Sequence, residues 1–206
     1  SQGASAISTN SGAAYIAKYP GALGSSLKIS VCDSANAYSS TIYPTTSGLQ
    51  YSIEFSVGSN TATVTVANTV AGAATPPTNT ALNSFATSFI TGDYVIAGNS
   101  SSASLGAQFV KITSLPNTNS AGWTATANTF TASIGLSSVY TLSNNYTQTA
   151  TSSASNITRY WEYYDVVDKA PGTSPFVSTR NGSGDEIHIV VADEDGKITG
   201  VPGTIL

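Results

Sequence analysis

The sequence predicts a mainly β protein, arranged as a β-barrel or a β-sandwich. Charged residues form only 9% of the 206-residue chain, against about 25% in an average domain. Ser, Thr, Asn and Gly must therefore cover much of the surface, and these residues favour strands and turns over helices. Hydrophobic residues form 40% of the chain, which is enough for a packed core and argues against disorder.

Charge is distributed unevenly along the chain. Residues 55–158 contain only two charged side chains, Asp93 and Lys111. By contrast, twelve of the eighteen charged residues lie between Arg159 and Lys197. The chain therefore consists of two chemically different parts.

The first expected strand covers residues 27–32, where Leu, Ile and Val alternate with Lys, Ser and Cys at period 2. A turn precedes this strand at Pro20, Gly21 and Gly24, because proline fixes φ and glycine permits positive φ. Residues 14–18 form either a short extended segment or the end of a helix.

A β-hairpin and one short helix are expected next. Residues 49–56 and 61–68 alternate apolar and polar side chains on either side of a Gly-Ser-Asn turn. Within the following segment, Leu82, Phe85 and Phe89 have helical spacing.

The rest of the chain is expected to be strands. They are predicted at residues 92–97 and 107–113, joined by a polar loop at 98–106, within 121–150, and at 160–167. A second hairpin is expected from residues 186–192 and 197–201, closed by Asp195 and Gly196. The total is eight to ten strands with at most one helix, which favours a barrel or sandwich over a βαβ unit.

The sequence contains no recognisable catalytic constellation. His188 is the only histidine, and no Gly-x-Ser-x-Gly motif accompanies it. It is expected on the half-exposed face of a strand, with Ile187, Ile189 and Val191 on the opposite face. Cys32, the only cysteine, is expected to be a small core residue rather than a reactive thiol.

The acidic residues near the C-terminus suggest structural rather than catalytic or metal-binding roles. Glu162, Asp165 and Asp168 could supply a carboxylate pair for glycoside hydrolysis. However, the spacing of Glu162 and Asp165 places them on opposite sides of a strand. The DEDG sequence at 193–196 has its glycine at position 4 of a possible calcium loop rather than position 6, so we interpret it as a turn.

An aromatic run is formed by Tyr160, Trp161, Tyr163 and Tyr164. Aromatic side chains at period 2 are typical of a core face with its solvent-side partner, and a sugar-stacking platform is the alternative. The net charge of −4 and pI of about 4.6 argue against a phosphate-binding surface. The apolar runs are too short to span a membrane, and the missing initial Met suggests a processed or excised chain.

Two segments together resemble the contractile tail sheath protein of T4-like myoviruses, especially those that infect marine cyanobacteria. The first, residues 16–34, reads IAKYPGALGSSLKISVCDS and is similar to the turn and strand that open the central region of sheath proteins. The second, residues 163–206, contains PGTS, GSGDE and DEDG turns in the same order as the sheath segment. Residues 35–158 match nothing in that family.

This resemblance implies a domain organisation and a function. Residues 13–34 and 159–206 would form one sheath-like β subdomain, and residues 35–158 an inserted β domain on the exterior. The chain would be a middle fragment of a structural virion protein used in genome delivery, without enzymatic activity, catalytic residues, metal or cofactor. Its partners would be copies of the parent subunit and the inner tail tube, in the phage tail and, during assembly, in the host cytoplasm. It would bind neither nucleic acid nor membranes, and the isolated fragment would be a monomer.

Two other function classes remain open at this point. A carbohydrate-binding or adhesin β-sandwich would expose an aromatic patch beside loops, whereas a sheath fragment would bury Trp161. A glycosidase or esterase would require His188 or a carboxylate pair within a cleft.

Overall fold

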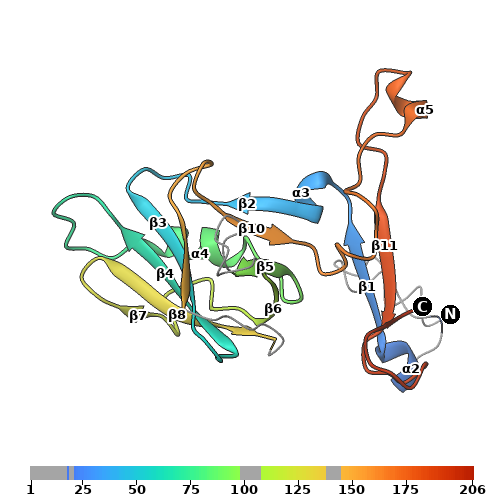
Figure 1. The fold of residues 1–206 in the computed structure, drawn as a ribbon, viewed down its shortest axis with the longest axis horizontal. Coiled ribbons are helices and arrows are strands. Elements are labelled where there is room, and N and C mark those ends of the chain that lie inside the picture. The colour runs from blue at the N-terminus through green and yellow to red at the C-terminus, as the bar shows by residue number, and fades with distance from the viewer. Residues whose placement is uncertain (1–17, 19–20, 98–107, 138–144) are drawn as a thin grey trace. The chain divides into compact units, whose positions relative to one another are not determined.

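The computed structural model describes residues 18, 21–97, 108–137 and 145–206, which fall into two compact units (Figure 1). Unit 1 combines the chain up to Ala35 with Asp165–Leu206, and unit 2 is Asn36–Tyr164. The expectations for residues 14–17, Pro20 and the loop at 98–106 lie outside the described residues.

The mainly β prediction is confirmed, with two antiparallel sheets in the described parts of the chain. Twelve strands are present among these residues, which is more than the eight to ten expected. Several of the strands have only two to four residues, which explains why the sequence pattern missed them.

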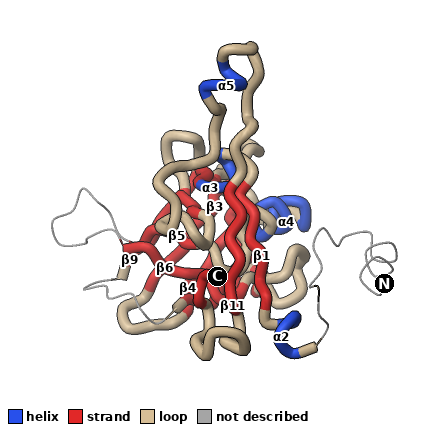
Figure 2. The backbone as a smooth tube through the Cα atoms, turned by 90° about the vertical axis from the view of Figure 1, so that its right-hand side faces the viewer, coloured by secondary structure: helices blue, strands red, loops and turns tan. Residues whose placement is uncertain are grey.

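Unit 1 is built on a three-stranded sheet with the order β1-β11-β12. Strands β1 (Leu27–Cys32) and β11 (His188–Asp193) pair antiparallel over six residues, and Figures 1 and 2 show them side by side. The short strand β12 (Thr204–Ile205) pairs with the end of β11. The strand expected at residues 27–32 is therefore confirmed, and its partner comes from the far end of the chain.

The predicted hairpin between residues 186–192 and 197–201 is wrong in its second strand. Residues 197–201 form turns, and β11 pairs with β1 and β12 instead. The reason is that the Asp193 carboxylate accepts hydrogen bonds from the backbone N–H groups of Ile198 and Thr199. Because these N–H groups donate to a side chain, they cannot form backbone hydrogen bonds with β11.

Two helical segments of four residues each belong to unit 1, namely α2 (Ala22–Ser25) and α5 (Pro175–Ser178). Segment α5 lies near the tip of the long loop that precedes β11 in both views (Figures 1 and 2). Ser174 caps it by accepting from Val177 N, and the Asp185 carboxylate accepts from Ser174 N and Oγ. These bonds lower the pKa of Asp185 and fix the loop.

Unit 2 is built on one antiparallel sheet with the order β2-β10-β5-β6-β8-β4-β3-β9, and β7 pairs with β8. Its elements are α3 (Ala35–Tyr38, which begins at the end of unit 1), β2 (Ser39–Ile42), β3 (Leu49–Phe55), β4 (Thr61–Asn68), α4 (Asn79–Ala86), β5 (Tyr94–Ala97), β6 (Gln108–Ser114), β7 (Thr124–Ala125), β8 (Thr129–Leu136), β9 (Tyr146–Ala150) and β10 (Ile157–Tyr160). The hairpin expected at 49–68 is confirmed by seven β3–β4 residue pairs.

One hydrophobic core fills unit 2. The inward residues of both halves of the sheet contribute to it, including Ile53, Val64 and Val110. The predicted short helix is confirmed as α4, which places Leu82 and Phe85 in the same core. Because all of the described residues that form this core come from unit 2, we expect the unit to be stable without unit 1.

The aromatic strand predicted at residues 160–167 is wrong beyond its first residue. Strand β10 ends at Tyr160, and residues 162–166 form turns. The strand stops there because its pairing with β2 and β5 ends at Tyr160. Unit 2 extends to Tyr164 and so includes residues 159–164, which the sequence analysis grouped with the flanking segments.

The two ends of unit 2 are held together by hydrogen bonds. Strands β2 and β10 pair over four residues. Just outside this ladder, Trp161 N donates to Tyr38 O at 2.8 Å, and Tyr38 Oη donates to Tyr164 O at 2.8 Å. A unit whose entry and exit lie together can be inserted into another fold at little cost.

We therefore expect residues 36–164 to fold without the rest of the chain. The isolated unit should unfold cooperatively, with a melting temperature within about 5 °C of that of unit 2 in the whole chain. Circular dichroism and the dispersion of amide NMR signals would measure this. A fragment beginning at residue 44 lacks α3 and β2 and should be clearly less stable, whereas disorder in 36–164 itself would contradict the inference.

Candidate functional site

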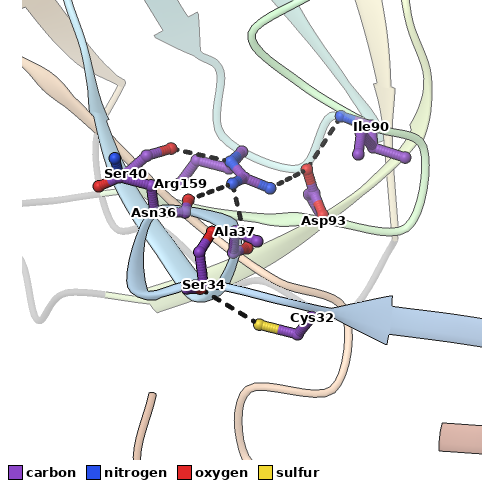
Figure 3. Close-up of polar contacts among 8 residues, drawn as sticks. All are labelled: Cys32, Ser34, Asn36, Ala37, Ser40, Ile90, Asp93 and Arg159. Atoms are coloured by element: carbon purple, nitrogen blue, oxygen red, sulfur yellow. Dashed lines mark hydrogen bonds and ion pairs between the residues drawn. The ribbon is translucent and has the colours of Figure 1, made fainter. Parts of the chain in front are cut away.

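A buried charge cluster lies where the chain enters unit 2 (Figure 3). Arg159 on β10 donates through Nη1 to Asp93 Oδ2 at 2.9 Å. Its Nε donates to Ser40 Oγ at 3.0 Å, and its Nη2 donates to the carbonyl oxygens of Asn36 and Ala37 at 2.8 and 3.1 Å. One guanidinium therefore fastens α3, β2 and the start of β5 to β10.

The cluster is structural in its chemistry. Asp93 and Arg159 are only 2% and 7% exposed. Burial raises the pKa of Asp93, and the hydrogen bonds from Arg159 and Ile90 N oppose that rise. Since a catalytic group must reach its substrate, a carboxylate this enclosed is suited to holding backbone segments rather than to a reaction.

Lys111, the other charged residue within residues 55–158, also has a partner of opposite charge. Lys111 Nζ lies 3.0 Å from Glu162 Oε1. Both charged side chains of residues 55–158 therefore find opposite charges just after position 158, on Arg159 and Glu162. The sequence marks Asp93 and Lys111 as isolated charges, and this isolation was the available signal that each needs a partner from outside the region.

The Asp193 carboxylate is the polar centre of unit 1. It is fully buried and bonds Ser26 Oγ, Thr199 Oγ1 and the backbone N–H groups of Ile198 and Thr199. Burial favours a higher pKa, but the hydrogen bonds from Ser26, Thr199 and Ile198 outweigh it and hold the pKa of Asp193 well below its usual range. Asp193 thus organises the DEDG turn, and the sequence did not indicate the role of Ser26.

The acidic residues that the sequence offers as a carboxylate pair are Glu162, Asp165 and Asp168. Within the described ranges, no group of three or more His, Cys, Asp or Glu side chains could hold a metal ion. Glu162 has a lysine partner, while Asp165 and Asp168 are exposed.

His188 lies half-buried on β11, opposite Cys32 of β1. Its Nε2 is 2.9 Å from the carbonyl oxygen of Lys169, so the side chain ties a loop to the sheet. Cys32 is buried, and its Sγ donates to Ser34 O at 3.6 Å (Figure 3).

We expect His188→Ala to leave any function of the chain unchanged, because the sequence gives this histidine no catalytic motif and its Nε2 lies against a backbone carbonyl. Losing one partly exposed hydrogen bond should cost about 1 kcal/mol. Binding assays and thermal unfolding of the two forms would test this. A hydrolytic activity that disappears in the variant would show that His188 is catalytic.

An aromatic cluster is the most distinctive surface feature of unit 2. It consists of Tyr94, Phe109, Tyr160 and Tyr164. The Phe109 ring is 5.1 Å from that of Tyr160 and stacks on that of Tyr164 at 4.8 Å, measured between centroids. Tyr164 also lies 5.3 Å from Tyr94 and 5.2 Å from Tyr160.

The structure divides the aromatic run predicted from the sequence. Tyr160 and Tyr164 belong to the cluster, whereas Trp161 is buried against Tyr163 with centroids 5.5 Å apart. Sequence reasoning missed Phe109 and Tyr94, which come from other strands. The signal that could have found them is that each is an outward-facing aromatic next to an inward valine in a Ser/Thr-rich chain.

Both features proposed to separate the function classes are present. Trp161 is 5% exposed, as expected of a sheath fragment, and Phe109 is 42% exposed, as expected of a ligand-binding module. A separate pocket between α4 and the β3–β4 hairpin is lined largely by Thr, Ser and Pro and contains no acidic or basic side chain.

Comparison with protein-family models, curated proteins and solved structures gives no significant match. Among the described residues, no helix has the length and hydrophobicity needed to cross a membrane. Inference about function therefore depends on the residues and their arrangement.

Proposed function

We propose that this chain is part of a contractile phage tail sheath subunit, a structural virion component used in genome delivery. The observation that carries the proposal is the β1–β11 pairing. It joins residues 16–34 and 163–206, the two segments that resemble sheath proteins, although the whole of unit 2 separates them in sequence. Two segments that match one family in order and polarity would be expected to share a subdomain.

Unit 2 has the properties of an insertion. It has its own core, and its entry and exit are paired through β2 and β10. In the proposed sheath, this unit would lie on the outside of the tail, where an added domain does not disturb the packing of neighbouring subunits. Its low charge is compatible with a salty medium, in which exposed charges are strongly screened.

The proposed function requires packing rather than catalysis. A contractile sheath stores free energy by arranging copies of one subunit in two different ways, and contraction is the passage to the more stable arrangement. The subunit needs rigid bodies that move without unfolding. The Asp193 network in unit 1 and the Arg159 cluster in unit 2 provide such rigidity.

Immunoelectron microscopy tests the proposal directly. Antibodies raised against residues 36–164 are applied to phage particles whose genome encodes this chain. We expect periodic labelling along the whole tail, in both extended and contracted particles. Labelling confined to fibres, baseplate or capsid, or no labelling of the particle, would refute a sheath role.

The isolated 206-residue chain is expected to be a monomer. A helical tube needs contacts between two different patches of each subunit, and in the sheath family these involve linking arms that lie outside the two segments resembled by residues 16–34 and 163–206. Light scattering should therefore give a mass near 21 kDa. A stable ring or tube formed by this chain alone would show that its own surfaces carry assembly.

A further inference from the structure

The outer surface of the unit 2 sheet changes character from one part to another. On β3, β4 and β8 many outward positions carry short polar side chains, as at Ser52, Thr63, Thr65 and Ser133. A sheet face in contact with water is normally polar in this way. On β10, β5 and β6 the outward positions instead carry the rings of the aromatic cluster.

Strand register explains how these rings come together. Tyr160 of β10 is opposite Tyr94 of β5, which is opposite Lys111 of β6. Phe109 precedes Lys111 by two residues and therefore faces the same side. These four strand residues face outwards, because the residues next to them in sequence, such as Val95 and Val110, are buried in the core.

The turn after β10 completes the surface and fixes its shape. It brings Tyr164 against Phe109 and Tyr94, and it brings the Glu162 carboxylate to Lys111. Gly92 lies beneath this carboxylate, since a Cβ at that position would be 2.9 Å from Glu162 Cδ. The rings are thus held by contacts with one another, and the Glu162 carboxylate is held by Lys111 and by Gly92, before any ligand arrives.

We propose that this aromatic surface binds a neutral saccharide. Tyrosine combines an apolar ring with a polar hydroxyl, which suits a sugar ring with apolar C–H faces and a rim of hydroxyl groups. Phe109, the most exposed member, provides the stacking face. Tyr94, Tyr160 and Lys111 provide hydrogen-bonding groups at its border.

The absence of net charge beside the rings favours a neutral ligand. The two charged groups beside the rings neutralise one another, so the site favours neither an anion nor a cation. Aromatic platforms also bind single-stranded nucleic acids, but they do so together with a positively charged groove. Here the chain has a net charge of −4. The proposal is independent of the sheath assignment, since any exterior domain could carry such a site.

Titration of the full chain with a defined panel tests the proposal. The probes are cellohexaose, maltohexaose, laminarihexaose, xylohexaose and N-acetylchitohexaose, with oligothymidylate as the nucleic-acid comparison. Amide NMR shifts report binding and its location. We expect at least one saccharide to bind with a Kd below about 1 mM, with shifts concentrated around the aromatic cluster.

Point variants distinguish binding at the aromatic cluster from non-specific binding. Phe109→Ala should weaken binding at least tenfold, and Tyr160→Phe, which keeps the ring, should weaken it less. Phe176→Ala removes a phenylalanine that is 66% exposed in unit 1 and should have no effect. If Phe109→Ala disrupts the fold, the location of the shifts in the unaltered chain and the effect of Tyr160→Phe decide the question.

Three results would overturn the proposal. One is that no saccharide in the panel causes shifts at a concentration of 10 mM. The second is saccharide binding whose shifts lie away from the cluster or whose affinity is unchanged by Phe109→Ala. The third is tighter binding of oligothymidylate at the same residues, which would make the surface a nucleic-acid platform.

Discussion

Replacing Arg159 with methionine is expected to destabilise unit 2 by about 3–5 kcal/mol, because it removes one partner of a buried ion pair. The substitution leaves the Asp93 carboxylate in the core without its counter-charge. It also leaves the carbonyl oxygens of Asn36 and Ala37 without the donor that they share. Urea unfolding followed by tryptophan fluorescence measures the effect, because Trp123 and Trp161 are both buried in unit 2.

A double-mutant cycle distinguishes the charge pair from simple loss of packing. Asp93→Asn combined with Arg159→Met removes both charges, so the double variant should be more stable than Arg159→Met alone. Lys111→Met breaks the partly exposed pair with Glu162 and provides the matched control, with an expected loss below about 1 kcal/mol. If Arg159→Met also lost less than about 1 kcal/mol of stability, the buried cluster would contribute little.

Local patterns in the sequence were sufficient where the decisive forces are local. The β3–β4 hairpin follows from period-2 alternation on either side of a glycine-containing turn at Gly58, whose φ is +69°. Helix α4 follows from the spacing of Leu82, Phe85 and Phe89, with Thr78 as its N-cap. In both cases the residues that determine the element lie within it or next to it.

The same patterns failed where the outcome depends on distant partners. Residues 160–167 continue an aromatic alternation, yet β10 ends at Tyr160 because its neighbouring strands provide no further ladder. Residues 197–201 alternate as a strand would, but a buried aspartate captures their amides. Periodicity records which side of a strand is apolar, and it carries no information about side chains that bind backbone groups.

The candidate binding surface was only half predictable for a related reason. Tyr160 and Tyr164 were recognised because they are close in sequence. Tyr94 and Phe109 join them only through the register of β10, β5 and β6. Register between strands more than ten residues apart is set by core packing as a whole, which a single sequence does not display.

Replacing Asp193 with alanine is expected to melt unit 1 at a temperature lower by roughly 5 °C or more. The carboxylate accepts from Ser26, Thr199 and Ile198, and these bonds join the start of β1 to the turn after β11. Without it, the backbone amides at 198 and 199 lose their acceptor. The loss of amide NMR signals from β1 and β11 on heating measures unit 1 separately, and Glu194→Gln, at an exposed neighbour, is the control.

The same carboxylate should make unit 1 sensitive to acid, and the direction follows from its pKa. Folding lowers the pKa of Asp193 below the unfolded value of about 3.9, so the folded state binds fewer protons in the interval between the two values. Its contribution to stability is therefore complete above about pH 5 and is lost as the pH falls below about 4 towards the folded pKa. Asp185 acts in the same direction, because its pKa is also lowered.

Comparison with Asp193→Asn isolates the contribution of this one residue to the acid sensitivity. The amide keeps the size of the side chain but cannot ionise. We expect the melting temperatures of unit 1 in the two forms to differ most above pH 5 and to converge between about pH 4 and pH 2. A difference that stays constant over that range would show that Asp193 stabilises unit 1 by its shape and hydrogen-bonding geometry, and that its negative charge contributes nothing.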